Sequence, residues 1–368
     1  MPDKGKVTKK FAERGVRRAE LHDLITTLDS VGPRNSKIIE VAGEQGAGKT
    51  RLLADLTREA ELRGFTVLSG RWTELEQDVP LHAFNQVFSS RLADSVLADL
   101  PAPTATLLRE VSVDPTSVLD RPKRQRVPLH QAVRVLLGHC AREELMLVFD
   151  DFHWADQYST ELIEYLVRWP VDAALALVIA HRPWQASPQL RSTLAHGVEL
   201  GTVQSVRLGA LSVGQAAEIL GQEGPDDRLE QLHRDSGGNP LYLLMLAQRS
   251  EEPEARWPTH SWDDFTEQSA LVIGEFATLA PTESAVASAA AVLGDTFDED
   301  MLAEVTEMNR EEISAAVGGL SRRGLVRSNG AAEGYSFRHP VLRELLYSTA
   351  LVAVPDGLRA QIENLLAR

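Results

Sequence analysis

The chain has 368 residues, of which 43% are hydrophobic and 25% are charged, and its formal net charge is −15. This composition is typical of a folded protein of two or three domains, and the negative charge argues against a freestanding nucleic-acid binder because phosphate contacts need a positive surface. Cys140 is the only cysteine, which excludes an intrachain disulfide. The longest apolar run, residues 173–180, is too short to span a bilayer, so we expect a cytoplasmic protein without membrane contact.

The first 36 residues are expected to form an N-terminal arm and a helix. Residues 1–18 are rich in lysine and arginine and are interpreted as a solvated terminus. Residues 20–28 repeat apolar side chains with helical spacing, and residues 31–36 hold the glycine and proline typical of a turn.

Residues 37–51 carry the most specific motif of the chain. An apolar segment, 38–42, predicts a buried strand, and the sequence GEQGAGKT that follows at 43–50 fits the G-x-x-x-x-G-K-[ST] pattern of a phosphate-binding loop. Residues 49–63 predict a helix with one apolar face. The three glycines of the loop are expected to adopt positive φ, which lets the backbone N–H groups approach an anion at the helix N-terminus.

The motif assigns roles to individual side chains. Lys49 is predicted to bind the β- and γ-phosphates of a nucleotide, and Thr50 to offer its hydroxyl to Mg²⁺. The residues expected to surround the nucleotide at the loop are Gly43, Glu44, Gln45, Gly46, Ala47, Gly48, Lys49, Thr50 and Arg51.

The next segment is less regular. Residues 65–69 predict a second strand bounded by glycines. Residues 72–128 contain several prolines and are interpreted as an irregular helical insertion with helical patches near 84–88 and 92–100, after which a helix is expected over 129–143.

Two later strands end in polar residues that can serve a nucleotide. The strand over 145–149 is followed by Asp150, predicted to hold Mg²⁺, and by Asp151, predicted to orient or deprotonate the attacking water. The strand over 174–180 leads to Arg182, which either reaches the γ-phosphate or caps the strand end at the surface, whereas His153 is assigned to packing.

With a short strand at 205–208, these strands alternate with helices. Because ligands gather at the carboxyl ends of parallel strands, the pattern predicts a doubly wound parallel α/β domain over residues 37–208.

The pattern changes to helical after residue 208. A capping box, Ser212 with Gln215, opens a helix, a second helix covers 228–234, and Pro240 begins a third. Residues 209–250 are therefore predicted to form a small helical lid, joined by a linker over 251–264 to the last domain.

Residues 265–368 are predicted to form a winged-helix domain with a terminal helix. Helices are expected near 265–279, 283–293, 299–305 and 310–323, then a two-stranded turn at 325–327 and 335–337, and an apolar helical face within 358–366. The helix at 310–323 opens with Glu311 and Glu312, which would face phosphates, so direct DNA binding by this chain is not expected.

Five motifs together resemble a known family. They are GEQGAGKT at 43–50, LMLVFDDFHWAD at 145–156, AHRP at 180–183, SGGNPLYLL at 236–244 and FRHPVLRELLY at 337–347. In this order they resemble the ATPase module of the STAND class of signal-transducing P-loop ATPases, and within it the large ATP-binding LuxR-type transcriptional regulators.

The resemblance implies an AAA-like P-loop NTPase fold and further site residues. Arg182 matches the family's first sensor arginine, Pro240 the lid proline that packs on adenine, and His339 the winged-helix histidine near the β-phosphate of ADP. The family's N-terminal F-x-x-R-x-x-E-L box is matched in part, by Phe11 and Arg14. It departs at Arg17, where the family has an acid.

The leading hypothesis is an ATP/ADP-binding signal-transduction switch with slow hydrolysis, acting through a protein partner or self-association, and by resemblance in transcriptional regulation. The choice of ATP over GTP also follows from the resemblance. Family regulators usually continue into helical repeats and a helix-turn-helix, so the chain is either a fragment of such a regulator or a standalone switch. Two alternatives stay open: a continuously cycling AAA-like ATPase that remodels a partner, and a non-hydrolysing nucleotide-binding scaffold.

Overall fold

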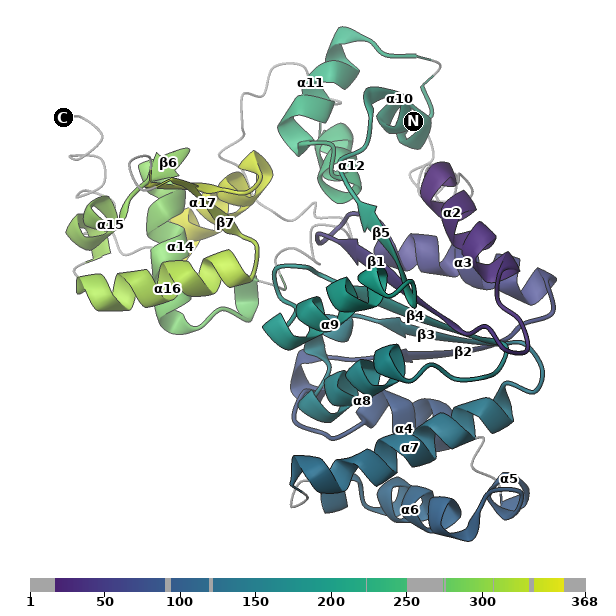
Figure 1. Ribbon diagram of the computed structural model, residues 1–368. Helices are drawn as coiled ribbons and strands as arrows, with labels where there is room; N and C mark the ends of the chain where they lie inside the picture. The colour runs from purple at the N-terminus through teal and green to yellow at the C-terminus, as the bar shows by residue number, and fades with distance from the viewer. Residues whose placement is uncertain are drawn as a thin grey trace. The chain divides into compact units, whose positions relative to one another are not determined.

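The computed structural model of the chain describes residues 17–89, 94–118, 122–222, 224–249, 274, 276–306, 308–330 and 334–353 (Figure 1). The chain divides into two compact units. The sheet unit runs from Arg17 to Gly209, and the helical unit comprises the described residues from Ala210 onward.

Five parallel strands form the centre of the sheet unit, in the order β2-β3-β4-β1-β5. Their bounds are β1 (Lys37–Gly43), β2 (Thr66–Arg71), β3 (Leu145–Asp150), β4 (Leu175–His181) and β5 (Val203–Leu208). Continuous apolar runs suit such a sheet because helices cover both of its faces. The prediction of a parallel α/β sheet is confirmed.

Side chains along each central strand alternate between two cores. Met146 and Val148 of β3 belong to the core beneath α2 (Arg18–Asp29) and α3 (Lys49–Leu62). The residues between and beside them point to the opposite core. That core lies under α4 (His82–Ser89), α7 (Lys123–Cys140), α8 (Gln157–Arg168) and α9 (Pro188–Glu199). By this alternation Asp150, two residues after Val148, lies on the α3 side of the sheet.

The segment between β2 and β3 is more regular than its prolines indicated. It contains η1 (Glu74–Glu76), α4, α5 (Asp94–Ala98), α6 (Ala102–Val113), η2 (Pro115–Val118) and α7. Helix α6 was not predicted, and α7 begins before the predicted residue 129. Proline is tolerated in the first helical turn, where its missing N–H has no partner to lose, and Pro103 lies there in α6.

Within its described residues, the helical unit includes three short helices, then four more helices and a small sheet. The helices are α10 (Val213–Leu220), α11 (Asp227–Ser236), α12 (Pro240–Arg249), α14 (Pro281–Leu293), α15 (Glu299–Thr306), α16 (Arg310–Arg322) and α17 (Pro340–Ala353). The sheet has the order β6-β8-β7, with β6 (Thr296–Phe297), β7 (Val326–Gly330) and β8 (Gly334–Phe337). Strand β6, at only two residues, gave no sequence signal.

One apolar core joins all these helices. Leu229 and Leu243 of the first three helices lie in the same core as Val286 of α14 and Leu342 of α17. The proposed division of this part into a lid and a winged-helix domain stays a prediction. Of the helix expected near 265–279, residues 265–273 lie outside the described residues, as does the helical face expected within 358–366.

Candidate functional site

The loop between β1 and α3 uses its glycines for two different reasons. Gly46 and Gly48 have φ of 71° and 94°, a left-handed conformation that side chains disfavour. Gly43 does not, which corrects the expectation that all three glycines adopt positive φ. A Cβ at Gly43 would lie 3.1 Å from Leu208 Cβ and 3.3 Å from Ala47 Cβ, so this position needs glycine for space.

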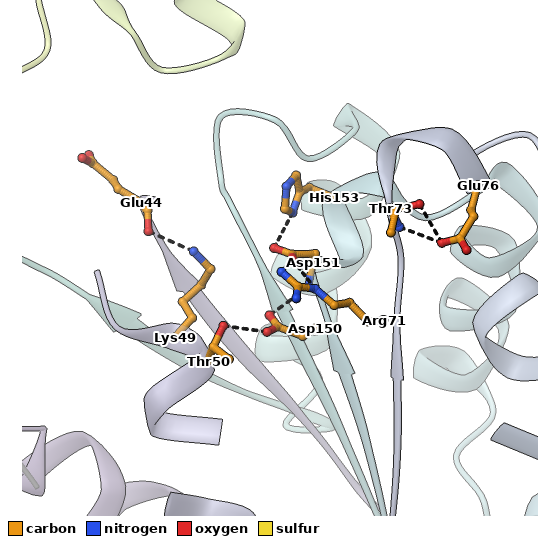
Figure 2. Close-up of polar contacts among 9 residues, drawn as sticks. All are labelled: Glu44, Lys49, Thr50, Arg71, Thr73, Glu76, Asp150, Asp151 and His153. Carbon is orange, nitrogen blue, oxygen red and sulfur yellow. Dashed lines mark hydrogen bonds and ion pairs between the residues drawn. The ribbon is translucent and has the colours of Figure 1, made fainter. Parts of the chain in front are cut away.

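The N-terminus of α3 is built to receive an anion. Gly48 is its N-cap, no side chain caps the helix, and its first turn has no acidic residue. The first backbone N–H groups of a helix have no intrahelical acceptor, so here they remain for an external one. The buried Lys49 Nζ donates to the carbonyl oxygen of Gly43 at 2.9 Å and adds a positive charge beside the loop. It also donates to the carbonyl oxygen of Glu44 at 2.9 Å (Figure 2).

Thr50 and Asp150 meet beside this loop. Thr50 Oγ1 donates to Asp150 Oδ2 at 2.7 Å, although the two residues are 100 positions apart (Figure 2). The contact follows from the strand alternation, which turns Asp150 toward the start of α3. A hydroxyl and a carboxylate are ligands that suit Mg²⁺, which takes one or two carboxylates and completes its shell with water and phosphate oxygens. The described residues contain no cluster of three His, Cys, Asp or Glu side chains suited to a metal, and Mg²⁺ held with a nucleotide needs none.

Asp151 lies in a strained conformation and forms an ion pair. Its φ of 52° and ψ of 35° are left-handed, which aspartate tolerates better than most residues. Its Oδ2 accepts hydrogen bonds from Arg71 Nε at 2.8 Å and Nη2 at 2.5 Å (Figure 2). This hydrogen bond raises the pKa of Arg71. Arg71, the last residue of β2, stands opposite Asp150 in the parallel register.

Sequence reasoning missed Arg71, although a signal existed. If β2 and β3 are neighbours, their carboxyl ends coincide, and a charged residue ending one strand lies beside the acids ending the other. The order of the strands was the missing information.

His153, which was assigned to packing, is fully buried and its ring packs on Trp154 with a centroid distance of 5.0 Å. Its side chain has 0% exposure, both ring nitrogens lack a hydrogen-bond partner, and Nδ1 lies 4.0 Å from Asp151 Oδ1 (Figure 2). Burial, with the charges of Arg182 and Lys49, lowers the pKa of His153 to about 2, so the ring is neutral at physiological pH. The structure thus brings Arg182 into the electrostatic surroundings of the site.

A buried pair ties the loop strand to its neighbour. His181 Nε2 lies 2.8 Å from Glu40 Oε1, and the two residues belong to β4 and β1. Burial alone would raise the pKa of Glu40, but the hydrogen bond with His181 and a second one with Ser205 outweigh it, and the pKa is lowered. The pair anchors β1 three residues before the loop begins.

Arg17 also contacts the phosphate loop, from outside the strands. Its Nη2 donates to the carbonyl oxygens of Ala47 at 3.2 Å and Gly209 at 2.6 Å, and its Nη1 donates to Glu20 Oε1 at 2.9 Å. Arg17, which departs from the family's N-terminal F-x-x-R-x-x-E-L box, therefore supports the phosphate loop. Phe11 and Arg14 lie outside the described residues.

Pro240 and His339 lie in the helical unit, whereas the loop residues lie in the sheet unit. Pro240 is the first residue of α12, and the ring of His339 packs on Tyr242 of the same helix with a centroid distance of 4.8 Å. A Cβ at Gly237 would lie 3.1 Å from His339 Nδ1, so the histidine also contacts the turn before α12. The structure brings these two predicted residues together around one turn.

Residues 15–179 match the family model described as the AAA ATPase domain. An uncharacterized protein of Rhizobium meliloti (strain 1021) is 24% identical over 382 residues, which cover 91% of this chain and 35% of that protein. The chain thus spans about a third of the length of this curated relative.

Two solved structures are distant likenesses. The Signal Transduction ATPase with Numerous Domains (STAND) protein with a tetratricopeptide repeat sensor from Pyrococcus horikoshii is 15% identical, with 94% of this chain and 44% of that chain covered and a TM-score of 0.34. The Orc1 protein of Aeropyrum pernix, solved in complex with DNA, is 15% identical, with 94% of each chain covered and a TM-score of 0.46.

Proposed function

We propose that this chain, whose residues 15–179 match the model of the AAA ATPase domain, is a P-loop ATPase that acts as an ATP/ADP-dependent switch of the STAND type. One observation carries the nucleotide site: the buried Lys49 and the Thr50–Asp150 hydrogen bond converge on an uncapped helix N-terminus. An ammonium group, a row of backbone donors and a hydroxyl–carboxylate pair are what a nucleotide with its Mg²⁺ requires.

In this proposal Thr50 and Asp150 hold Mg²⁺, which supplies charge neutralisation for the phosphates when it is bound. Lys49 binds the β- and γ-phosphates, and Arg182 approaches the γ-phosphate from the end of β4. Asp151 receives a proton from the attacking water. Its ion pair with Arg71 competes with that role, which favours slow hydrolysis.

The helical unit would distinguish ADP from ATP. Pro240 would pack on the adenine and His339 would bind near the β-phosphate of ADP, giving a closed form that ATP releases. The shared core of the helical unit supports this, because residues on α12 and before α17 then move as one body. Only a difference in affinity of ATP and ADP for the two forms can drive such a change.

The switch would act by contacting a protein partner or a second copy of the chain. It would act in the cytoplasm and regulate transcription. Within the described residues no helix is both long and apolar enough to cross a membrane. A winged-helix role for the last part would be internal, because α16 opens with Glu311 and Glu312.

A continuously cycling ATPase is the second candidate, and the match to the AAA ATPase domain favours it. It predicts turnover of about 1 s⁻¹ or more, near the lower range of typical enzymes. The switch predicts far slower turnover and a tightly held ADP.

The experiment is to denature the purified chain and identify the nucleotide it releases. Near-stoichiometric ADP supports the switch, whereas an empty protein with fast turnover supports the cycling ATPase. Lys49→Ala is expected to abolish nucleotide binding, and Lys37→Ala, at the other end of β1, to preserve it. Unchanged ATP affinity in Lys49→Ala would contradict the placement of the site.

A further inference from the structure

Two non-glycine residues have positive φ in the part of the chain that the structure describes, and they lie in the segments that leave neighbouring strands. Asp151, with φ of 52°, follows β3, and Leu81, with φ of 53°, lies after β2 and directly before α4. Side chains disfavour this conformation, and it persists only where the surrounding structure fixes it. A bulky leucine is an even clearer outlier than an aspartate. Both positions therefore call for a group that holds them.

The carboxylate of Asp156 is bonded to both segments. It accepts hydrogen bonds from the backbone N–H groups of Tyr158 and Ser159, at 2.9 Å each, and from Ser159 Oγ at 2.5 Å. The N–H of Leu81 donates to the same carboxylate. Burial raises the pKa of Asp156, and these hydrogen bonds act against that rise. Burying a carboxylate is costly unless it is hydrogen-bonded, so this group is retained together with its donors.

One short helical turn connects Asp156 to Asp151. The N–H of Trp154 donates to the carbonyl oxygen of Asp151 at 3.0 Å, which fixes the backbone of the turn. The buried Phe152 packs on Trp72, the residue directly after β2, with a centroid distance of 4.7 Å. The segments that leave β2 and β3 are thus packed together near the sheet, and the Asp156 carboxylate joins them again further along the chain.

We propose that Asp156 is a positioning residue that fixes the left-handed backbone of Asp151 and so aims its carboxylate at the attacking water, an inference that rests on the proposed ATPase function. Asp156 acts through the turn and forms no bond in the reaction. Without its carboxylate the turn relaxes, and the Asp151 side chain leaves its position. Such a displacement matters, because about 1 Å of misplacement can cost about 100-fold in rate.

The first test is Asp156→Ala, which removes the acceptor of all these hydrogen bonds. We expect the single-turnover rate of phosphate release at saturating ATP to fall by about 10- to 100-fold. ATP and ADP affinities should stay within about threefold of wild type, because Lys49 and the start of α3 are unchanged. A wild-type rate overturns the proposal, and so does a loss of ATP affinity as large as the loss of rate.

Asp226→Ala is the matched control, because it removes the same side chain from another helix N-cap. Asp226 is the N-cap of α11, and its Oδ1 accepts a hydrogen bond from the Leu229 N–H at 2.7 Å. We expect this variant to lose a comparable cap and to hydrolyse ATP like wild type. An equal loss of rate in both variants would trace the effect to the loss of a helix cap and overturn the proposal.

Two milder variants separate positioning from charge and from misfolding. Asparagine caps a helix about as well as aspartate, so Asp156→Asn should keep about a third of the rate or more. If it is as slow as Asp156→Ala, the charge itself is required and a positioning role is overturned. Ser159→Ala removes only the Oγ hydrogen bond and should slow hydrolysis by about threefold. If Asp156→Ala does not fold, Ser159→Ala decides, and a wild-type rate in it overturns the proposal.

A double variant tests whether Asp156 acts through Asp151. In an Asp151→Asn background, Asp156→Ala should slow hydrolysis little further, since groups that act as a unit are not additive. Full additivity overturns the proposal. A chain that binds ATP but never hydrolyses it also overturns the inference and leaves the switch intact, whereas a chain that binds no nucleotide overturns the proposed function itself.

Discussion

At the scale of single residues, the site combines groups fixed by the motif with groups fixed by neighbouring strands. Lys49 and Thr50 follow from the loop pattern, and Asp150 follows from the alternation along β3. Arg71, His153 and Arg17 depend on which segments become neighbours. A substitution that adds volume in the loop tests the first kind of group, and a substitution that removes a charge tests the second kind.

Gly43 gives the test of space. Gly43→Ala is expected to destabilise the sheet unit by about 1–3 kcal/mol, because its Cβ would press against Leu208 and Ala47. The measurement is the denaturant midpoint. Gly32→Ala is the matched control, since nothing lies within 4 Å of its Cβ and its φ is not positive, and it should be neutral or slightly stabilising. Equal midpoints for the two variants would show that the loop adapts freely.

Arg71 gives the test of charge. Removing it by Arg71→Ala frees Asp151 Oδ2 and is expected to raise the single-turnover rate of hydrolysis by about threefold or more, with little change in stability because the arginine is largely exposed. Phosphate release under saturating ATP is the measurement. Arg63→Ala removes a comparable surface arginine that pairs with Asp29 and Glu59, far along the chain from the acids, and should leave the rate unchanged. A slower Arg71→Ala would instead make Arg71 part of the phosphate site.

At the scale of elements, strand ends were more predictable than the segments between them. Apolar runs that end in glycine or in charged residues located the central strands, and the same runs indicated that both sheet faces are covered. Helix α6 was not predicted, because its prolines were interpreted as ending helices. Pro103, however, lies in the first turn of α6, where a helix tolerates proline. Strand β6 could not be found from the sequence, since a two-residue strand has no period of its own and exists only by pairing with β8.

The candidate site divides in the same way. The sequence located the loop and the acids of β3, because both are local patterns. The order of the strands brings Arg71 beside Asp151, and no local pattern contains that order. His153 was assigned to packing, and the lack of a hydrogen-bond partner for its ring nitrogens could not be predicted, because it depends on the folded surroundings and not on the sequence around the residue.

The Glu40–His181 pair is expected to hold β1 and β4 together at the level of the loop. Glu40→Ala leaves the buried His181 Nε2 without its partner and should cost about 1–3 kcal/mol in the free energy of unfolding. Chemical denaturation is the measurement, with Glu230→Ala on the surface of α11 as the control, because its side chain is half exposed and its ion pair with Arg234 should add little. If Glu40→Ala is as stable as Glu230→Ala, the Glu40–His181 pair does not contribute to the free energy of unfolding.

At the scale of the whole molecule, buried titratable groups should make the fold sensitive to acid. Burial lowers the pKa of both His153 and His130, so the unfolded chain takes up protons below about pH 6.5 while the folded chain does not. Stability is therefore fully present above that pH and declines as the pH falls. The lowered pKa of Glu40 acts in the same direction below pH 4.5.

The melting temperature should therefore fall between pH 7.5 and pH 5.5, with a contribution from His153 of roughly 1 kcal/mol. His153→Asn should flatten this part of the profile, and His196→Asn, at an exposed histidine of α9, should not. Parallel profiles for wild type and His153→Asn would mean that the ring is protonated in the folded chain.

The two ends of the sheet unit lie together. Arg17 and Gly209, its first and last residues, are 192 positions apart and are joined by a hydrogen bond of 2.6 Å. The same guanidinium donates a hydrogen bond to the carbonyl oxygen of Ala47 in the phosphate loop. The chain therefore enters and leaves the sheet unit at neighbouring positions. A pull on the backbone at either end of the unit therefore acts beside the phosphate loop.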